Sequence, residues 1–221
     1  MTDRRQKRGF TLMELLVVIA IISLLVTVMV PVMLGFMKGR GLSMSGNNIG
    51  GFVAFARSEA MNTRQKHAIV FYEEPTVLNE GGAVPLSAGP GMVVFRIDED
   101  LGPDEQTVNY VKQLDFEGQI GGSVDFAPSW KERAPRGPNT YLPDAANSRF
   151  SGLYKIVVLE DGRLIIPEDK PGYVLDTNET KSLKTDLVLT DGDRFVYLDF
   201  NSATGAVKRS VVMTREETGE Q

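Results

Sequence analysis

The longest apolar run in the chain lies close to its N-terminus. Residues 15–37 read LLVVIAIISLLVTVMVPVMLGFM, 23 consecutive positions without a charged side chain. At a rise of 1.5 Å per residue they would form a helix of about 34 Å, which is long enough to cross a hydrocarbon core of about 30 Å. The pattern predicts a transmembrane helix over residues 10–37.

Basic residues precede this run and set its orientation. Arg4, Arg5, Lys7 and Arg8 lie just before it, and the cytoplasmic flanks of membrane helices are enriched in Lys and Arg. We therefore expect a single-pass protein with its N-terminus in the cytoplasm and everything after Lys38 outside.

One carboxylate, Glu14, lies just inside the N-terminal edge of the apolar region. An ionised carboxylate at membrane depth costs a few kcal/mol or more, and it usually has a partner. A secretory signal peptide explains the segment poorly, because the run is too long and PVMLGFMKG is a poor cleavage site. A plain signal anchor fits the hydropathy but has no evident use for Glu14.

Helix-compatible sequence continues beyond the membrane and predicts an exterior amphipathic part of the helix over 38–65. Apolar residues recur there at steps of three and four, at Ile49, Phe52, Val53, Ala56 and Ala60.

The predicted exterior helix also contains many glycines and several charged residues. Glycine is frequent between residues 35 and 51, so we expect bending or local melting there. Arg57 and Glu59 fall mostly on the polar face, where surface ion pairs are the more common role.

The rest of the chain reads as β-strands joined by turns. Short β-branched and aromatic runs, single or paired across a turn, occur at 67–73, 91–98, 154–168, 186–200 and 195–213. The turns are expected at Asp161–Gly162, Asp191–Gly192 and Asn201–Gly205. The fold class is therefore α+β: a long N-terminal helix packed on the antiparallel β-sheet of a globular domain over 66–214.

Two segments lack the strand pattern. Residues 127–149 are rich in Pro, Asn and charge, and we expect a long surface loop. Trp130, Tyr141 and Phe150 in or beside it are either a partner-binding surface or buried anchors of the loop. Residues 215–221 are expected to form a flexible tail.

Composition excludes several kinds of function. The chain has no cysteine and one histidine, His67, which excludes disulfides, thiolate chemistry and multi-His metal sites. Without residues 1–9 it carries 20 Lys and Arg against 28 Asp and Glu, so we expect no nucleic acid as a partner. No catalytic motif is present, and we expect a protein that is not an enzyme.

The densest acidic run is DEDLGPDE at 98–105. Asp98, Asp100 and Asp104 are weak candidates for calcium ligands, but the EF-hand spacing is absent and a solvated acidic turn is the favoured interpretation. No other cofactor is implied. His67 opens a predicted strand, where a surface or packing role is expected.

The stretch RGFTLMELLVVIAIISLL resembles the prepilin signal of type IV pilins and type II secretion pseudopilins. The resemblance implies that prepilin peptidase cuts between Gly9 and Phe10, which removes a leader over 1–9 and leaves Phe10 as an N-methylated N-terminus. It also implies that Glu14 pairs with the Phe10 ammonium of a neighbouring subunit in a filament. Pro31 lies where the family often has a helix-kinking proline.

The same resemblance implies the protein's partners and location. The partners would be prepilin peptidase, other pilins or pseudopilins in a filament, an inner-membrane assembly platform and membrane lipid. The chain would lie in the inner (cytoplasmic) membrane, with its C-terminal domain in the periplasm.

A second resemblance points to a subfamily. FVAFARSEAMNTRQKHAIVFY and VYLDFNSATGAVKRSVVM are similar to blocks in the H-type (GspH/FimT-like) minor pseudopilins. This implies a minor pseudopilin of a type II secretion filament. The alternatives are a FimT-like pilin that binds DNA through Lys208 and Arg209, or a plain signal-anchored exterior binding protein.

Overall fold

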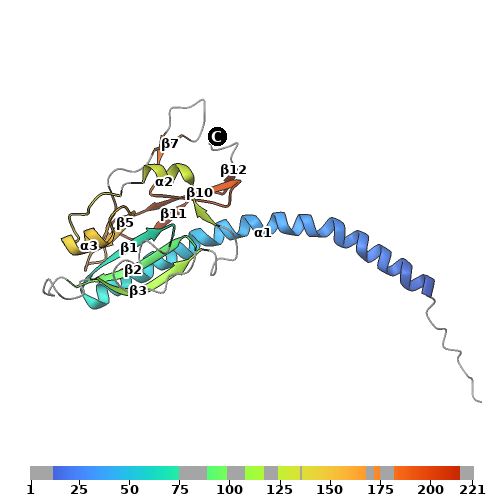
Figure 1. Cartoon of the computed structure of the whole chain (residues 1–221), viewed down its shortest axis with the longest axis horizontal. Helices are drawn as coiled ribbons and strands as arrows, with labels where there is room; N and C mark the ends of the chain where they lie inside the picture. The colour runs from blue at the N-terminus through green and yellow to red at the C-terminus, as the bar shows by residue number, and fades with distance from the viewer. Residues whose placement is uncertain are drawn as a thin grey trace, which may run out of the picture. The chain divides into compact units, whose positions relative to one another are not determined.

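Helix α1 (Leu12–Thr63) is 52 residues long and is the first element of the computed structural model (Figure 1). The structure describes residues 12–74, 89–98, 108–116, 124–134, 136–167, 172–174 and 182–214. The chain divides into two units, Met1–Lys38 and Gly39–Gln221.

The exterior part of α1 packs through the predicted apolar stripe. Ile49, Val53, Ala56 and Ala60 are all completely buried. The helix is unbroken between residues 35 and 51, so of the expected bending or local melting the melting is wrong. Tertiary packing of an apolar face decides whether a helix forms more strongly than the low intrinsic propensity of glycine does.

The end of α1 is marked by a residue in the left-handed conformation. Arg64 has φ 53°, and Thr63 Oγ1 donates a hydrogen bond of 2.8 Å to the Glu59 carbonyl one turn earlier. A left-handed residue commonly ends a helix. Only Arg64 and Gln65 separate α1 from the first strand.

The first sheet has five strands in the order β3-β2-β1-β5-β6, and every pair in it is antiparallel. Its strands are β1 (Lys66–Tyr72), β2 (Gly91–Ile97), β3 (Val108–Asp115), β5 (Lys155–Val158) and β6 (Leu164–Ile165). Figure 1 shows β1, β2 and β3 side by side. The predicted strands at 67–73 and 91–98 and the hairpin at 154–168 are confirmed, whereas β3 was not predicted.

A second antiparallel sheet has the order β11-β10-β9-β4, and β12 also pairs with β10. Its strands are β4 (Asp125–Phe126), β9 (Leu187–Thr190), β10 (Arg194–Phe200), β11 (Val207–Arg209) and β12 (Met213–Thr214). A further pair consists of β7 (Gly172–Val174) and β8 (Ser182–Lys184). The turns predicted around Gly192 and Gly205 are confirmed, and both glycines have positive φ, at 101° and 68°.

The main core lies between α1, one face of the first sheet and the second sheet. Alternate residues of β1 divide between two cores: Ile69 and Phe71 face this one, and Ala68, Val70 and Tyr72 face a second. This alternation is the period of a strand that is covered on both faces. The α+β prediction is confirmed.

The segment 127–149 is not a simple surface loop. It contains α2 (Pro128–Arg133) and α3 (Asp144–Arg149), and both anchor side chains at its ends are buried: Trp130 is 2% exposed and Phe150 is fully buried. Phe150 belongs to the second core. Of the three aromatic residues considered for partner binding, only Tyr141 is exposed, at 45%.

Candidate functional site

The first candidate is the N-terminal part of α1. Leu12–Val30 has a mean hydropathy of 2.8 over 19 residues and the length to cross a membrane, and none of it is buried within the chain. Leu24 is 68% exposed and Met29 is 65% exposed. Such a surface needs lipid or other apolar helices to cover it.

Glu14 lies in the first turn of this helix and is exposed. A carboxylate is favoured there because the N-terminus of a helix carries partial positive charge. Gly9 and Phe10, the predicted cleavage residues, lie outside the described residues.

The helix continues through Pro31. Four residues before Pro31, Thr27 Oγ1 donates to the Ser23 carbonyl at 2.8 Å, so the Thr27 hydroxyl is satisfied within the helix.

Arg57 is the second candidate, and its role differs from the expected surface ion pair. Its Nε donates to the Gly162 carbonyl at 2.6 Å, and its two Nη atoms donate to the carbonyls of Thr204 and Ala203, the latter at 3.3 Å. One guanidinium thus ties α1 to the β5–β6 turn and to the β10–β11 turn. Gly205 makes this possible, because a Cβ there would lie 2.9 Å from Arg57 Cδ.

Arg209 makes a similar contact, but it reaches from a strand to the helix. From strand β11 its Nη1 donates to the Ser43 carbonyl at 2.6 Å, to Ser43 Oγ at 2.8 Å and to Asn47 Oδ1 at 3.3 Å. Gly46 leaves room for this side chain, since a Cβ at that position would lie 2.8 Å from Arg209 Cδ. Lys208, the neighbouring residue, is exposed.

The calcium candidates are only partly within the described residues. Asp98 follows β2, and its carboxylate accepts hydrogen bonds from Gln65 Nε2 at 2.6 Å and Asn109 Nδ2 at 2.5 Å. Arg96 Nε lies 3.4 Å from the same carboxylate. Within the described residues no group of three His, Cys, Asp or Glu side chains could hold a metal. Asp100 and Asp104 lie outside them, and calcium binding stays a prediction.

His67 is a packing residue, as expected. It is completely buried in β1, and its Nδ1 lies 3.0 Å from the Gln65 carbonyl. Burial lowers the pKa of its imidazole, while the Gln65 carbonyl acts in the opposite direction. The ring is therefore neutral near pH 7.

Lys155 was not singled out by the sequence. It is 2% exposed, and its Nζ donates to the carbonyls of Gly137 at 2.8 Å and Phe150 at 3.3 Å, which fastens the 136–153 segment to β5. Burial lowers the pKa of its ammonium. A lysine that opens a strand is ordinarily exposed, so no sequence pattern indicates this role.

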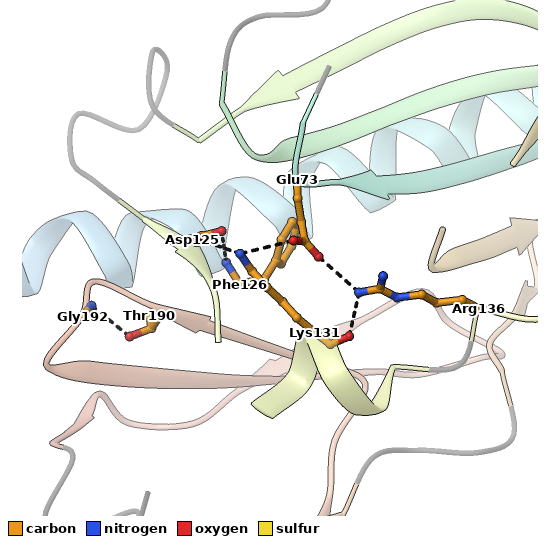
Figure 2. A network of polar contacts seen from close by, with 7 residues as sticks. All are labelled: Glu73, Asp125, Phe126, Lys131, Arg136, Thr190 and Gly192. Carbon is orange, nitrogen blue, oxygen red and sulfur yellow. Dashed lines mark hydrogen bonds and ion pairs between the residues drawn. The ribbon is translucent and has the colours of Figure 1, made fainter. Parts of the chain in front are cut away.

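A pocket of about 320 Å³ opens at the end of β1, with Phe71, Phe126, Trp130 and Tyr154 in its lining. Glu73, which also lines it, joins Lys131 at 3.5 Å and Arg136 at 3.2 Å (Figure 2).

The polar network in Figure 2 connects several elements around that pocket. Lys131 of α2 also pairs with Asp125 of β4 at 2.9 Å, and Arg136 donates to the Lys131 carbonyl at 2.6 Å. The side chains of the ion pairs are 25–46% exposed, and exposed pairs contribute about 1 kcal/mol or less each. The arrangement contains no nucleophile with an adjacent base among the described residues.

Comparison with known proteins bears on the N-terminal segment. The family model for the prokaryotic N-terminal methylation motif matches residues 4–30. No curated protein and no solved structure matches the chain significantly. A motif of this type implies processing by prepilin peptidase and assembly with other pilins, and its families consist of structural subunits rather than enzymes. Residues 4–30 therefore carry a prepilin-type signal, which, with the exposed apolar helix, supports placing the chain among the type IV pilins and pseudopilins as a membrane-anchored, single-pass protein.

Proposed function

We propose that this chain is a minor pseudopilin, a structural subunit of a type II secretion filament. Prepilin peptidase would cut between Gly9 and Phe10, and Phe10 would then be N-methylated. The subunit would be anchored in the inner membrane by residues 10–37, with its N-terminus on the cytoplasmic side and the domain over 66–214 in the periplasm. The observation that carries the proposal is the methylation motif at 4–30 leading directly into the exposed helix of Leu12–Val30.

Glu14 has a physical role in this proposal. A lone carboxylate or a lone ammonium is costly in a bundle of apolar helices, and removing one partner of a buried pair leaves the other uncompensated. In a filament the Glu14 carboxylate of one subunit would face the Phe10 ammonium of its neighbour. Because both charges are then satisfied in one register only, the pair sets the stagger between subunits.

The H-type assignment is supported by contacts between the two blocks that resemble that subfamily. Arg57 lies in the first block, FVAFARSEAM, and Thr204 and Gly205 lie in the second, NSATGAV. The Arg57 guanidinium donates to the Thr204 carbonyl. The Arg57 side chain also lies where a Cβ at Gly205 would be too close to it. One interaction thus joins the two blocks in this chain, although they lie 147 positions apart in the sequence.

The proposal is tested at the N-terminus. The protein would be extracted from membranes of cells that contain prepilin peptidase, and its N-terminal peptide identified by mass spectrometry. A peptide that begins at methylated Phe10 is expected. A peptide that begins at Met1 would refute the processing step and leave a plain signal anchor. The same preparation from cells without the peptidase provides the control, because it should retain residues 1–9.

A further inference from the structure

The pocket at the end of β1 has a rigid aromatic lining. Phe71, Phe126, Trp130 and Tyr154 line it, and these rings pack against one another with centroids 5.0–6.3 Å apart. Trp130 Nε1 also donates to the Asp186 carbonyl at 2.9 Å, which fixes the orientation of the indole. Ligand pockets are usually preformed in this way, with an apolar lining and a few polar groups that orient the ligand.

The charged residues that line the pocket give it a net negative charge. They are Glu73, Glu74 and Arg136. Glu73 and Arg136 neutralise each other at 3.2 Å, and Arg136 also donates to the Lys131 carbonyl. Glu74 is exposed, and no hydrogen bond or ion pair to another described residue engages its carboxylate. The acceptor left for a ligand is therefore the Glu74 carboxylate.

The size and lining of the pocket limit the class of ligand. Its volume of about 320 Å³ is roughly twice that of an engineered cavity of about 150 Å³ that admits benzene, so one ring with a short substituent fits. Aromatic rings favour offset or edge-to-face contacts with a further ring, and their faces attract cations. A carboxylate-bearing ligand is disfavoured, because Glu74 would repel it.

We propose that this pocket binds a small aromatic amine, with its ring against Trp130 and Phe126 and its ammonium beside the Glu74 carboxylate. The inference adds a ligand-binding site to the exterior domain and does not depend on the assignment as a pseudopilin. It combines two independent features of the pocket: the preformed aromatic lining selects a ring, and the unengaged carboxylate selects a positive charge.

The first test uses the intrinsic fluorescence of Trp130, which is the single tryptophan of the chain and lines the pocket. Full-length protein in detergent at about pH 7 would be titrated with phenethylamine, with phenethyl alcohol and with hydrocinnamate, which carry the same ring with a positive, a neutral and a negative arm. We expect a saturable change with phenethylamine, with a dissociation constant on the order of 1 mM. The alcohol should bind about fivefold more weakly, and hydrocinnamate more weakly still.

Three results of these titrations would overturn the inference. Equal affinity for the amine and the alcohol would show that the positive charge is not recognised. Tighter binding of hydrocinnamate would assign recognition to Arg136. A lack of saturable fluorescence change, together with no heat of binding in calorimetry, would show that the amine does not bind.

The second test separates the Glu74 carboxylate from the general charge of the domain. Glu74→Gln is expected to weaken phenethylamine binding about three- to fivefold, the range of a partly exposed ion pair, and to leave phenethyl alcohol binding unchanged. Glu132→Gln is the matched control, because Glu132 is exposed on α2 and does not line the pocket. Equal weakening by both variants would contradict a specific contact with Glu74.

A third variant tests the location of the ligand. Ser151 is exposed and lines the pocket, so the larger side chain of Ser151→Leu should occlude it and remove the saturable binding of both the amine and the alcohol. An unchanged far-ultraviolet circular dichroism spectrum would confirm that this variant is folded. If the folded variant binds phenethylamine as the parent chain does, the ligand lies elsewhere or in the detergent, and the inference is wrong.

The same chemistry can come from a free amine or from the N-terminal phenylalanine of a peptide. A Phe-Gly-Gly peptide titrated in parallel distinguishes these sources: tighter binding than phenethylamine identifies a chain end, and weaker binding identifies a free amine. The N-acetylated peptide lacks the ammonium and should not bind, and binding as tight as that of the free peptide would overturn the inference. None of these outcomes bears on processing at Phe10, so this inference and the proposed function fail separately.

Discussion

The guanidinium of Arg57 donates a hydrogen bond of 2.6 Å to the carbonyl of Gly162, a residue 105 positions later in the chain. The same side chain donates to Thr204, 147 positions away. A single arginine thus fixes the helix against two turns that belong to different sheets. Neither turn is close in sequence to α1, and each offers only backbone oxygens.

The contribution of Arg57 can be measured by substitution. Hydrogen bonds to charged groups contribute about 1.5–3 kcal/mol each, less where they are exposed, so we expect Arg57→Ala to lower the free energy of unfolding by about 2–3 kcal/mol in urea titrations. Arg57→Lys should recover only part of this, because one ammonium cannot reproduce the planar fork. Arg163→Ala is the control: its ion pair with Asp161 is exposed, and its effect should stay within about 0.5 kcal/mol. An equal loss in both alanine variants would contradict the role of Arg57.

Two glycines should respond in opposite directions to the same change. A Cβ at Gly91 would lie 2.6 Å from both the Leu114 carbonyl oxygen and Tyr72 Oη, whereas a Cβ at Gly51 would meet nothing within 4 Å. We expect Gly91→Ala to destabilise the protein by about 1–3 kcal/mol. Gly51→Ala, on the exposed side of α1, should stabilise it by about 0.5–1 kcal/mol. Thermal unfolding of the two variants beside the parent chain checks both signs.

His67 should make stability depend on pH. Burial lowers the pKa of its imidazole in the folded protein, whereas in the unfolded chain the pKa is about 6.5. Above about pH 6.5 the ring is neutral in both states; below it the unfolded chain takes up the proton first, so stability falls as pH falls. The side chains of Glu59 and Asp98 oppose this shift and Arg96 adds to it. Urea midpoints between about pH 7.5 and 5 should fall in the parent chain and less steeply in His67→Phe. Identical slopes would assign the dependence to other groups.

Glu14 is expected to matter for assembly and not for processing. If its charge pairs with the Phe10 ammonium of a neighbour, Glu14→Ala and the isosteric Glu14→Gln should both be cut after Gly9 yet enter filaments several-fold less well. The fraction of the subunit recovered in sheared or cross-linked filaments provides the measurement. Normal incorporation of either variant into filaments would refute the proposed charge pair between Glu14 and Phe10.

The sequence predicted those elements whose signal is local and long. The apolar run before Lys38, the stripe from Ile49 to Ala60 and the Asp-Gly turns each determine their structure through neighbouring residues. Strand β3 was missed because it is an edge strand with mainly half-exposed side chains, and because a bulge opposite Val94 and Phe95 interrupts its register. The two helices in 127–149 are six residues each, which is too short for a helical period to be recognised.

The arginine contacts could not be predicted for a different reason. Arg57 lies on the polar face of its helix in any sequence-based projection, and its partners are carbonyl oxygens, which every residue has. The unusual glycines were the available signal: Gly162 and Gly205 have positive φ and also lie against the Arg57 side chain. Recognising that coincidence requires the distance between segments, which the fold alone provides.

Arg209 and Arg57 also determine how the part of α1 that packs on the sheets is turned about its own axis. Arg209 holds the helix at Ser43 and Asn47, and Arg57 holds it ten residues later. Each residue of an α-helix advances the azimuth by about 100°. One residue inserted between Asn47 and Arg57 would therefore put the two anchors out of phase, so that only one of them could engage. The number of residues between Asn47 and Arg57 is thus constrained, because the two contacts together fix the rotation of this part of the helix against the strands and turns it touches.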